Sequence, residues 1–342
     1  MSSICWRSSR RGAVVDSTGG VSPSLAPPCR PALFFVPSKQ WHRSLLGSTI
    51  RCPSMAAPTP AEAVILVHCP DQPGIVARVA NGLHETGGNI LDAAQHTDFQ
   101  SETFLQRLHV SWPKSPPDAA AIDQALALLR EQLQLACQIR WVQQPRRVAI
   151  FVSRADHCLH DLLLLRRDGQ LHCEIALIVS NHADLRPIAD RFEIPFHHIP
   201  VPTSGNPEAE DAQLSLLREN DIDLVVLARY MRVLSLDFIN AYASRIINIH
   251  HSFLPAFAGA APYRQAHEKG VKLIGATAHF ATATLDDGPI IEQGVTRVSH
   301  RDSVQDMVRK GRDIERTVLA RAVRWYLEDR IIEHNGRAIV FE

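Results

Sequence analysis

An amide, an imidazole and a carboxylate occur in this chain at positions that could form one acyl-transfer site. Asn248 and His250 are two residues apart, and Asp286 comes later, in the turn-forming run Leu285-Asp286-Asp287-Gly288-Pro289. An Asn amide can donate to an oxyanion, a His can carry a proton near neutral pH, and a carboxylate can orient that His or take a proton from water. These residue types predict chemistry at an acyl–nitrogen bond.

The residues around Asn248 predict a buried strand that positions two of these groups. Residues 245–249 are mostly apolar and β-branched, and alternate residues of a strand point to the same side. Asn248 and His250 are therefore expected on one face. The strand leads into a loop at 252–262 that contains Pro and Gly, and open α/β sheets bind ligands where strands end in such loops.

The composition excludes several classes of partner. The chain has 342 residues, of which 45% are hydrophobic, which is enough for two folded domains. Its formal net charge is zero, which predicts that neither nucleic acid nor an anionic membrane is a partner. Apolar runs stay shorter than the roughly 18 residues that a spanning helix needs. Seven cysteines without a C-x-x-C spacing suggest neither a disulfide framework nor a cysteine zinc site. A small molecule is the expected partner.

Residues 1–54 have a different composition. They hold seven Arg or Lys, one acidic residue, and many Ser and Pro. This bias is typical of an organellar transit peptide, and we predict a mitochondrial location, with the plastid as the alternative. A disordered extension without a targeting role is the simpler interpretation, and Met55 could act as an internal start.

Residues 61–143 predict a βαββαβ domain of the ferredoxin-like type. A strand at 64–67 and the turn Asp71-Gln72-Pro73-Gly74 lead into a helix that ends at Gly87-Gly88, and the second half follows. The stretch resembles an ACT domain, whose members open with this strand and turn. The resemblance implies an amino-acid effector and pairing into a homo-oligomer, and a dimerisation module without an effector is the alternative. The remaining elements are expected at 89–97, 103–112, 117–135 and 138–142.

Residues 147–342 predict a Rossmann-like α/β domain. Strands and helices alternate from a first strand at 148–152, which is typical of a mostly parallel sheet covered by helices. The last element is a long helix over about 302–328 with apolar residues at helical spacing. The elements between them are expected at 157–166, 173–179, 184–192, 197–201, 209–219, 223–228, 272–280 and 289–297.

This second domain resembles the catalytic domain of folate-dependent formyltransferases. The motif is Asn-Ile-His-x-Ser-x-Leu-Pro at 248–255, followed by His279-Phe280 and by Leu285-Asp286-Asp287-Gly288-Pro289. The resemblance implies that Asn248, His250 and Asp286 are catalytic, that no cofactor or metal is used, and that 10-formyltetrahydrofolate binds beside the preceding strand. The residues expected at that substrate are Met231, Arg232, Val233, Leu234, His251 and His279, although apolar residues at 231–234 are also typical of a packing patch.

The formyl acceptor is the remaining question. Transformylases of this fold that act on glycinamide ribonucleotide carry a glycine-rich phosphate loop after the first strand, whereas residues 152–163 contain no glycine. The run His157-Cys158-Leu159-x-Asp161-Leu162-Leu163, the second histidine of the pair His250-His251 and the ACT domain resemble the formyltetrahydrofolate deformylase family. The resemblance implies hydrolysis of 10-formyltetrahydrofolate to tetrahydrofolate and formate, in support of one-carbon balance and purine metabolism.

Three other interpretations stay open. They are a transformylase with an amine acceptor, a non-catalytic folate or amino-acid sensor, and a zinc amide hydrolase with His250, His251, His279 and Asp286 as ligands. Ala261, in the run Gly-Ala-Ala-Pro, departs from the deformylase pattern and is similar to methionyl-tRNA formyltransferases. The departure concerns the details of the substrate site and not the predicted reaction.

Overall fold

The computed structural model describes residues 61–113, 119–202, 207–255 and 262–342. The leader predicted at 1–54 and the residue Ala261 lie outside these ranges. The described residues form two units with separate hydrophobic cores, and the chain passes from one to the other between β4 (Ala136–Trp141) and β5 (Arg146–Val152). Each unit is described by itself.

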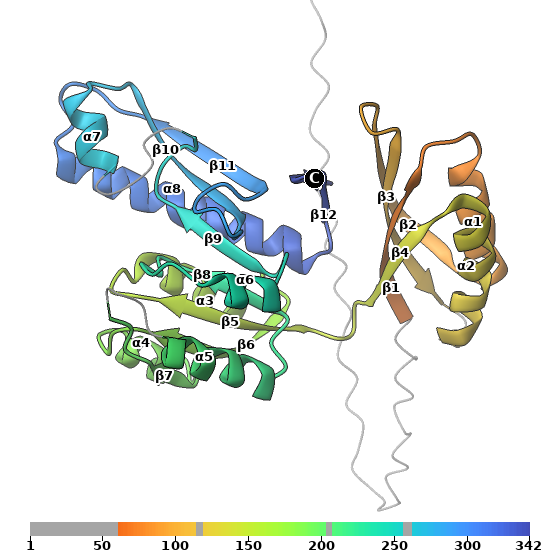
Figure 1. Cartoon of the computed structure of the whole chain (residues 1–342), viewed down its shortest axis with the longest axis horizontal. Helices are drawn as coiled ribbons and strands as arrows, with labels where there is room; N and C mark the ends of the chain where they lie inside the picture. The colour runs from red at the N-terminus through yellow and green to blue at the C-terminus, as the bar shows by residue number, and fades with distance from the viewer. Residues whose placement is uncertain (1–60, 114–118, 203–206, 256–261) are drawn as a thin grey trace, which may run out of the picture. The chain divides into compact units, whose positions relative to one another are not determined.

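The N-terminal unit is a four-stranded antiparallel sheet with two helices on one face (Figure 1). The strand order β2-β3-β1-β4 is that of the predicted βαββαβ unit. Gly74 stands before the first helix with φ 89°, a conformation that favours glycine, so the sequence sets this turn locally. The elements are β1 (Ala61–Pro70), α1 (Ile75–Glu85), β2 (Asn89–Asp98), β3 (Thr103–Trp112), α2 (Ala119–Leu133) and β4.

The second unit is built on a seven-stranded sheet of order β11-β10-β9-β8-β5-β6-β7. Strands β5 to β9 pair in parallel, and β10 runs in the opposite direction, pairing antiparallel with both β9 and β11, which confirms the predicted mostly parallel sheet. After β5 the chain adds β6 and β7 on one side of it and then continues with β8 on its other side. In open α/β sheets, ligands bind outside the carboxyl ends of the strands at the point where the strand order reverses in this way. The strands after β5 are β6 (Cys173–Ser180), β7 (Phe196–His198), β8 (Leu224–Leu227), β9 (Ile246–His250), β10 (Leu273–Phe280) and β11 (Ile290–Arg297).

Helices cover both faces of this sheet (Figure 1). One face packs against α3 (His157–Arg167), α4 (Arg186–Arg191) and the long α8 (Val304–Leu327). The other face packs against α5 (Pro207–Glu219) and α6 (Leu236–Ala241). Helix α8 begins at a capping box in which Ser303 and Asp306 bond to each other's backbone N–H, so its start is encoded locally.

Four short elements were absent from the sequence-based expectations. They are α6, α7 (Pro262–Glu268) and the hairpin of β12 (Ile331–His334) and β13 (Arg337–Val340). Each is seven residues or fewer, which is too short for hydrophobic periodicity to identify. None of the helices in the described ranges combines the length and apolar character of a membrane span.

Candidate active site

Strand β9 positions Asn248 and His250 as the sequence predicted. It pairs with β8 on one side and with β10 on the other, where Asn248 lies opposite His279 and His250 opposite Thr277. Asn248 is half-buried and His250 is buried. Both side chains line one cavity at the carboxyl end of β9, beside the point where strand succession reverses.

Asp286 reaches His250 through the tight connection between β10 and β11. A Cβ on Gly288 would collide with the carbonyl oxygen of Phe280, so only glycine lets this loop lie against the end of β10. Asp286 itself has φ 57°, a left-handed conformation that Asp tolerates better than most residues. Asp286 Oδ1 lies 3.1 Å from Nδ1 of His250 and 3.8 Å from Nε2 of His279.

The environment of His250 favours a neutral ring with its Nε2 available. Burial lowers the pKa of His250, and the Asp286 carboxylate opposes that shift without cancelling it. Nδ1–H donates to Asp286, and Nε2 has no hydrogen-bond partner among the described residues. A neutral imidazole in this tautomer offers the Nε2 lone pair to a proton.

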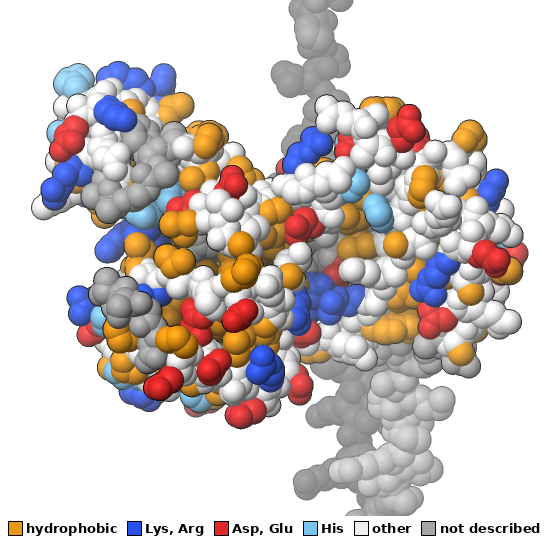
Figure 2. Space-filling view, viewed as in Figure 1, with side chains coloured by type: hydrophobic (Ala, Val, Ile, Leu, Met, Phe, Trp, Pro, Cys, Tyr) orange, Lys and Arg blue, Asp and Glu red, His pale blue; other side chains and the backbone are white. Residues whose placement is uncertain are grey.

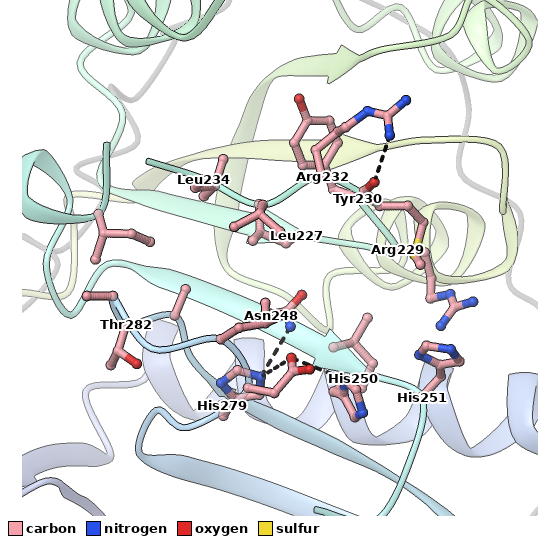
Figure 3. A pocket seen from close by; sticks show the side chains of 18 residues that line it. Leu227, Arg229, Tyr230, Arg232, Leu234, Asn248, His250, His251, His279 and Thr282 are labelled. Atoms are coloured by element: carbon pink, nitrogen blue, oxygen red, sulfur yellow. Dashed lines mark hydrogen bonds and ion pairs between the residues drawn. The ribbon is translucent and has the colours of Figure 1, made fainter. Parts of the chain in front are cut away.

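His279 holds the side chain of Asn248. Its Nδ1–H donates to the carbonyl of Phe280 over 2.8 Å, which leaves Nε2 as an acceptor for the Asn248 amide at 3.1 Å. Burial lowers the pKa of His279, so the neutral form that this arrangement needs is favoured. Figure 3 shows this contact between the Asn248 amide and the His279 ring, and the second N–H of the amide is left for another acceptor.

The cavity that contains these groups has a volume of about 410 Å³. Met231, Arg232, Val233 and Leu234 form its other wall, as predicted, and Met231 and Val233 are 55% and 71% exposed rather than core residues. Figure 2 shows histidine side chains in a hollow of this unit. The wall is held by Ser153, whose hydroxyl accepts from the backbone N–H of Met231 over 3.0 Å.

Several lining residues were not predicted from the sequence. Arg229 and Tyr230 precede the predicted segment, and Thr282 and Leu285 belong to the loop that carries Asp286. Arg229 has φ 64°, an uncommon conformation for a residue other than glycine. Leu285 stands in the motif that identified Asp286 but was not named as a lining residue, because these positions become neighbours only when β8 and β10 meet across β9. The other unpredicted lining residues are Leu227, Ile239, Ile249, Ala281 and Ala283.

Glu315 of α8 is a further buried carboxylate near this cavity. Its side chain is 1% exposed, accepts from Tyr263 over 2.7 Å and bonds to His157 over 2.8 Å, and lies 3.5 Å from Nε of Arg229. Burial alone would raise the pKa of Glu315, but its bonds to His157 and Tyr263 and the Arg229 charge lower it overall. The lowered pKa favours the ionised form of Glu315 despite its burial.

One potential metal-ligand set is present in the described part of the chain. His157, Cys158 and Glu315 have their ligand atoms within 4.8 Å of one another, but His157 and Glu315 already bond to each other. Burial raises the pKa of the Cys158 thiol, which disfavours the thiolate that a metal needs. The residues of the zinc alternative, including His251, do not form a set of three at this spacing in the described ranges.

Comparisons with known proteins agree on one family. The family model described as formyl transferase matches residues 146–323, and the ACT domain model matches residues 63–110. A formyltetrahydrofolate deformylase of Synechocystis is 54% identical over 82% of this chain and 98% of its own, and that of Bacillus subtilis is 47% identical over 81% and 93%. The crystal structure of a formyltetrahydrofolate deformylase from Pseudomonas syringae is 43% identical, has a TM-score of 0.80, and aligns over 83% of this chain and 96% of its own.

The predicted mitochondrial location, with its plastid alternative, is wrong by these comparisons. The similar proteins come from bacteria such as Synechocystis, Bacillus subtilis and Escherichia coli, which have neither organelle. The transit-peptide interpretation of residues 1–54 relied on composition alone, and compositional bias in a short polar segment is weak evidence for an address.

Proposed function

This chain belongs to the formyltetrahydrofolate deformylase family, and we propose that Asn248, His250 and Asp286 catalyse hydrolysis of 10-formyltetrahydrofolate to tetrahydrofolate and formate. The observation that carries the assignment of residues is their convergence: the three side chains line one cavity, Asp286 lies on Nδ1 of His250, and Nε2 of His250 has no partner within the described ranges. The relatives at 47–54% identity bear the deformylase name, so the transformylase and sensor alternatives are not favoured.

The first step is attack of water on the formyl carbon. His250 Nε2 accepts one proton from the water as its oxygen bonds to carbon, and Asp286 stabilises the imidazolium through Nδ1–H. The formyl oxygen becomes an oxyanion and accepts a hydrogen bond from the second N–H of the Asn248 amide. The first N–H of that amide is bonded to His279. A donor fixed in advance needs no reorganisation when the charge develops.

The second step breaks the carbon–nitrogen bond. His250 returns its proton to the leaving nitrogen of the folate, which departs as the neutral amine of tetrahydrofolate. The former formyl group, which now carries the oxygen of the attacking water, leaves as formic acid and loses a proton to solvent to give formate. The folate ring system lies against Met231, Arg232, Val233 and Leu234, where Met231 and Val233 expose apolar surface that suits a planar heterocycle.

The assay that tests this function is formate release. Purified full-length chain is incubated with 10-formyltetrahydrofolate, and formate is measured alongside tetrahydrofolate. We expect equal amounts of both, and loss of both in Asn248→Ala. Formylation of glycinamide ribonucleotide without formate release would instead support the transformylase function.

We propose that the reaction uses no metal and no organic cofactor. Asn248, His250 and Asp286 supply the oxyanion donor, the proton carrier and the orienting carboxylate, so each role is filled by a side chain. Metal analysis of the purified chain tests this. Turnover should survive dialysis against a chelator, and stoichiometric zinc whose removal abolishes turnover would contradict the proposal.

We propose that residues 61–143 form a regulatory ACT domain and residues 147–342 the catalytic domain. The ACT domain model matches residues 63–110, which supports the regulatory domain. The edge strands of this domain, β2 and β4, can pair with a second copy of the chain, which favours a homo-oligomer. An amino acid is the proposed effector. Formate production with and without glycine and methionine tests the effector, and the molecular mass of the protein in solution tests the homo-oligomer.

A further inference from the structure

A second cavity meets the substrate cavity at two side chains. It has a volume of about 390 Å³, and Arg229 and His251 line both cavities. Figure 3 shows the Arg229 side chain extending to the His251 ring. A molecule in the second cavity would therefore lie close to His250, whose ring centroid is 5.3 Å from that of His251.

The second cavity is cationic. Three guanidinium groups line it, from Arg229, Arg264 and Arg312, and one carboxylate, from Glu315. Glu315 is 1% exposed, and its oxygens are engaged by Tyr263 and His157, so it is a poor partner for the guanidinium groups of Arg264 and Arg312. Burial and the Arg229 charge lower the pKa of His251 to about 4, so this ring is neutral near pH 7. The balance of charge favours an anion.

Arg229 is prepared to hold that anion. Its side chain is 17% exposed, and Glu315 forms an ion pair with Nε at 3.5 Å, although Nε makes no hydrogen bond to the described residues. Nη1 is buried and has no hydrogen-bond partner among the described residues. A guanidinium has five N–H donors and binds a carboxylate with two at once, so Arg229 has unused donors for an anion beside it.

We propose that the second cavity binds formate, with Arg229 as its main contact and with Arg312 and Arg264 adding attraction. The proposal rests on the proposed function, because hydrolysis creates this small carboxylate next to His250. Formate then occupies the second cavity while tetrahydrofolate is still in the first. The two products leave by different sides of the Arg229–His251 pair, and water can reach the formyl carbon by the same path.

Binding of formate can be measured without any turnover. The single C–H proton of formate reports saturation transfer from the protein in an NMR experiment on the full-length chain without folate. A three-atom ligand binds no tighter than about 1 mM, so formate is titrated to about 100 mM. We expect a saturable signal that acetate reduces and that tetrahydrofolate leaves in place. Absence of a saturable signal would overturn the proposal.

Four variants locate the bound formate. Arg229→Met should weaken binding about tenfold or more, and Arg312→Gln, at the exposed rim, by about threefold. Arg309→Gln, one turn earlier on α8 and outside the cavity lining, is the matched control and should bind as the parent does. Asn248→Ala should also bind formate normally. Binding that Asn248→Ala abolishes and Arg229→Met retains would place formate in the first cavity and contradict the proposal.

Kinetics supply a separate test. Formate should inhibit without competing with 10-formyltetrahydrofolate, and Arg312→Gln should raise the inhibition constant of formate by about the same factor as it weakens binding. Competitive inhibition would contradict separate cavities. Because the NMR experiment needs no catalysis, formate binding and deformylase activity succeed or fail independently.

Discussion

Asn248 and His279 face each other across β9 and β10, and their side chains are joined by a 3.1 Å hydrogen bond. Because Nδ1–H of His279 donates to the Phe280 carbonyl, Nε2 is the ring nitrogen that accepts the hydrogen bond from the Asn248 amide. A backbone carbonyl at the end of β10 thereby fixes the orientation of the amide that receives the oxyanion. His279 is a positioning residue in this arrangement.

Replacement of His279 by Leu should lower kcat by about 10- to 100-fold and leave KM almost unchanged, because the amide of Asn248 loses its holder but remains present. Steady-state kinetics on 10-formyltetrahydrofolate measure this. Asn248→Ala should cost more, and the double variant should lose no more than Asn248→Ala alone. Losses that multiply in the double variant would mean that the two residues act independently.

Asp286→Asn should lower kcat by about 10²- to 10⁴-fold while the folate still binds, since the carboxylate acts on the imidazolium formed during reaction. The adjacent Asp287 is exposed and serves as a matched control, so Asp287→Asn should retain nearly full activity. Folate affinity is measured by fluorescence titration. Weakened binding with unchanged kcat would show that Asp286 is a binding residue only.

The pH dependence of kcat/KM should report His250. Because burial lowers its pKa below the ordinary 6.5, activity should rise with pH through a midpoint under 6.5 and level off by about pH 7. The Asp286 carboxylate raises this pKa, so Asp286→Asn should move the midpoint of the residual activity further toward acid. A midpoint above 6.5, or a shift toward alkali in that variant, would contradict the role of His250 as proton acceptor.

Gly311 tests the packing that holds Glu315. A Cβ at this position of α8 would collide with the Tyr263 ring and hydroxyl, so Gly311→Ala must displace Tyr263 from Glu315. We expect a loss of about 1–3 kcal/mol in the free energy of unfolding, although alanine is the better helix former by about 1 kcal/mol. Chemical denaturation measures this.

Two further variants make that test specific. Thr317→Ala on the exposed side of α8 should change stability by no more than about 0.5 kcal/mol. Gly311→Ala introduced together with Tyr263→Ala should cost much less than it does alone, because the colliding ring is gone. An equal cost in both backgrounds would place the strain elsewhere.

Local patterns were enough for the framework of this protein. The βαββαβ order, the mostly parallel sheet and the long C-terminal helix follow from hydrophobic periodicity and turn residues, which depend on neighbours a few positions apart. Asn248 and His250 were placed on one face by strand alternation. Asp286 was placed at the site only by its motif, because the connection that returns it to His250 depends on the close approach of Gly288 to β10.

The sequence alone determined which side chains can do the chemistry, and the tertiary structure decided how they are held and what surrounds them. Glu315 has the appearance of a surface residue in a charged helix, yet it is buried beneath Arg229, Tyr263 and His157, which come from three other segments. Their contacts depend on the order in which β5, β8 and β9 pair and on the packing of α8 against them. Contacts between distant segments leave no periodic signal in the sequence, so the second cavity and its charge became visible only in the folded chain.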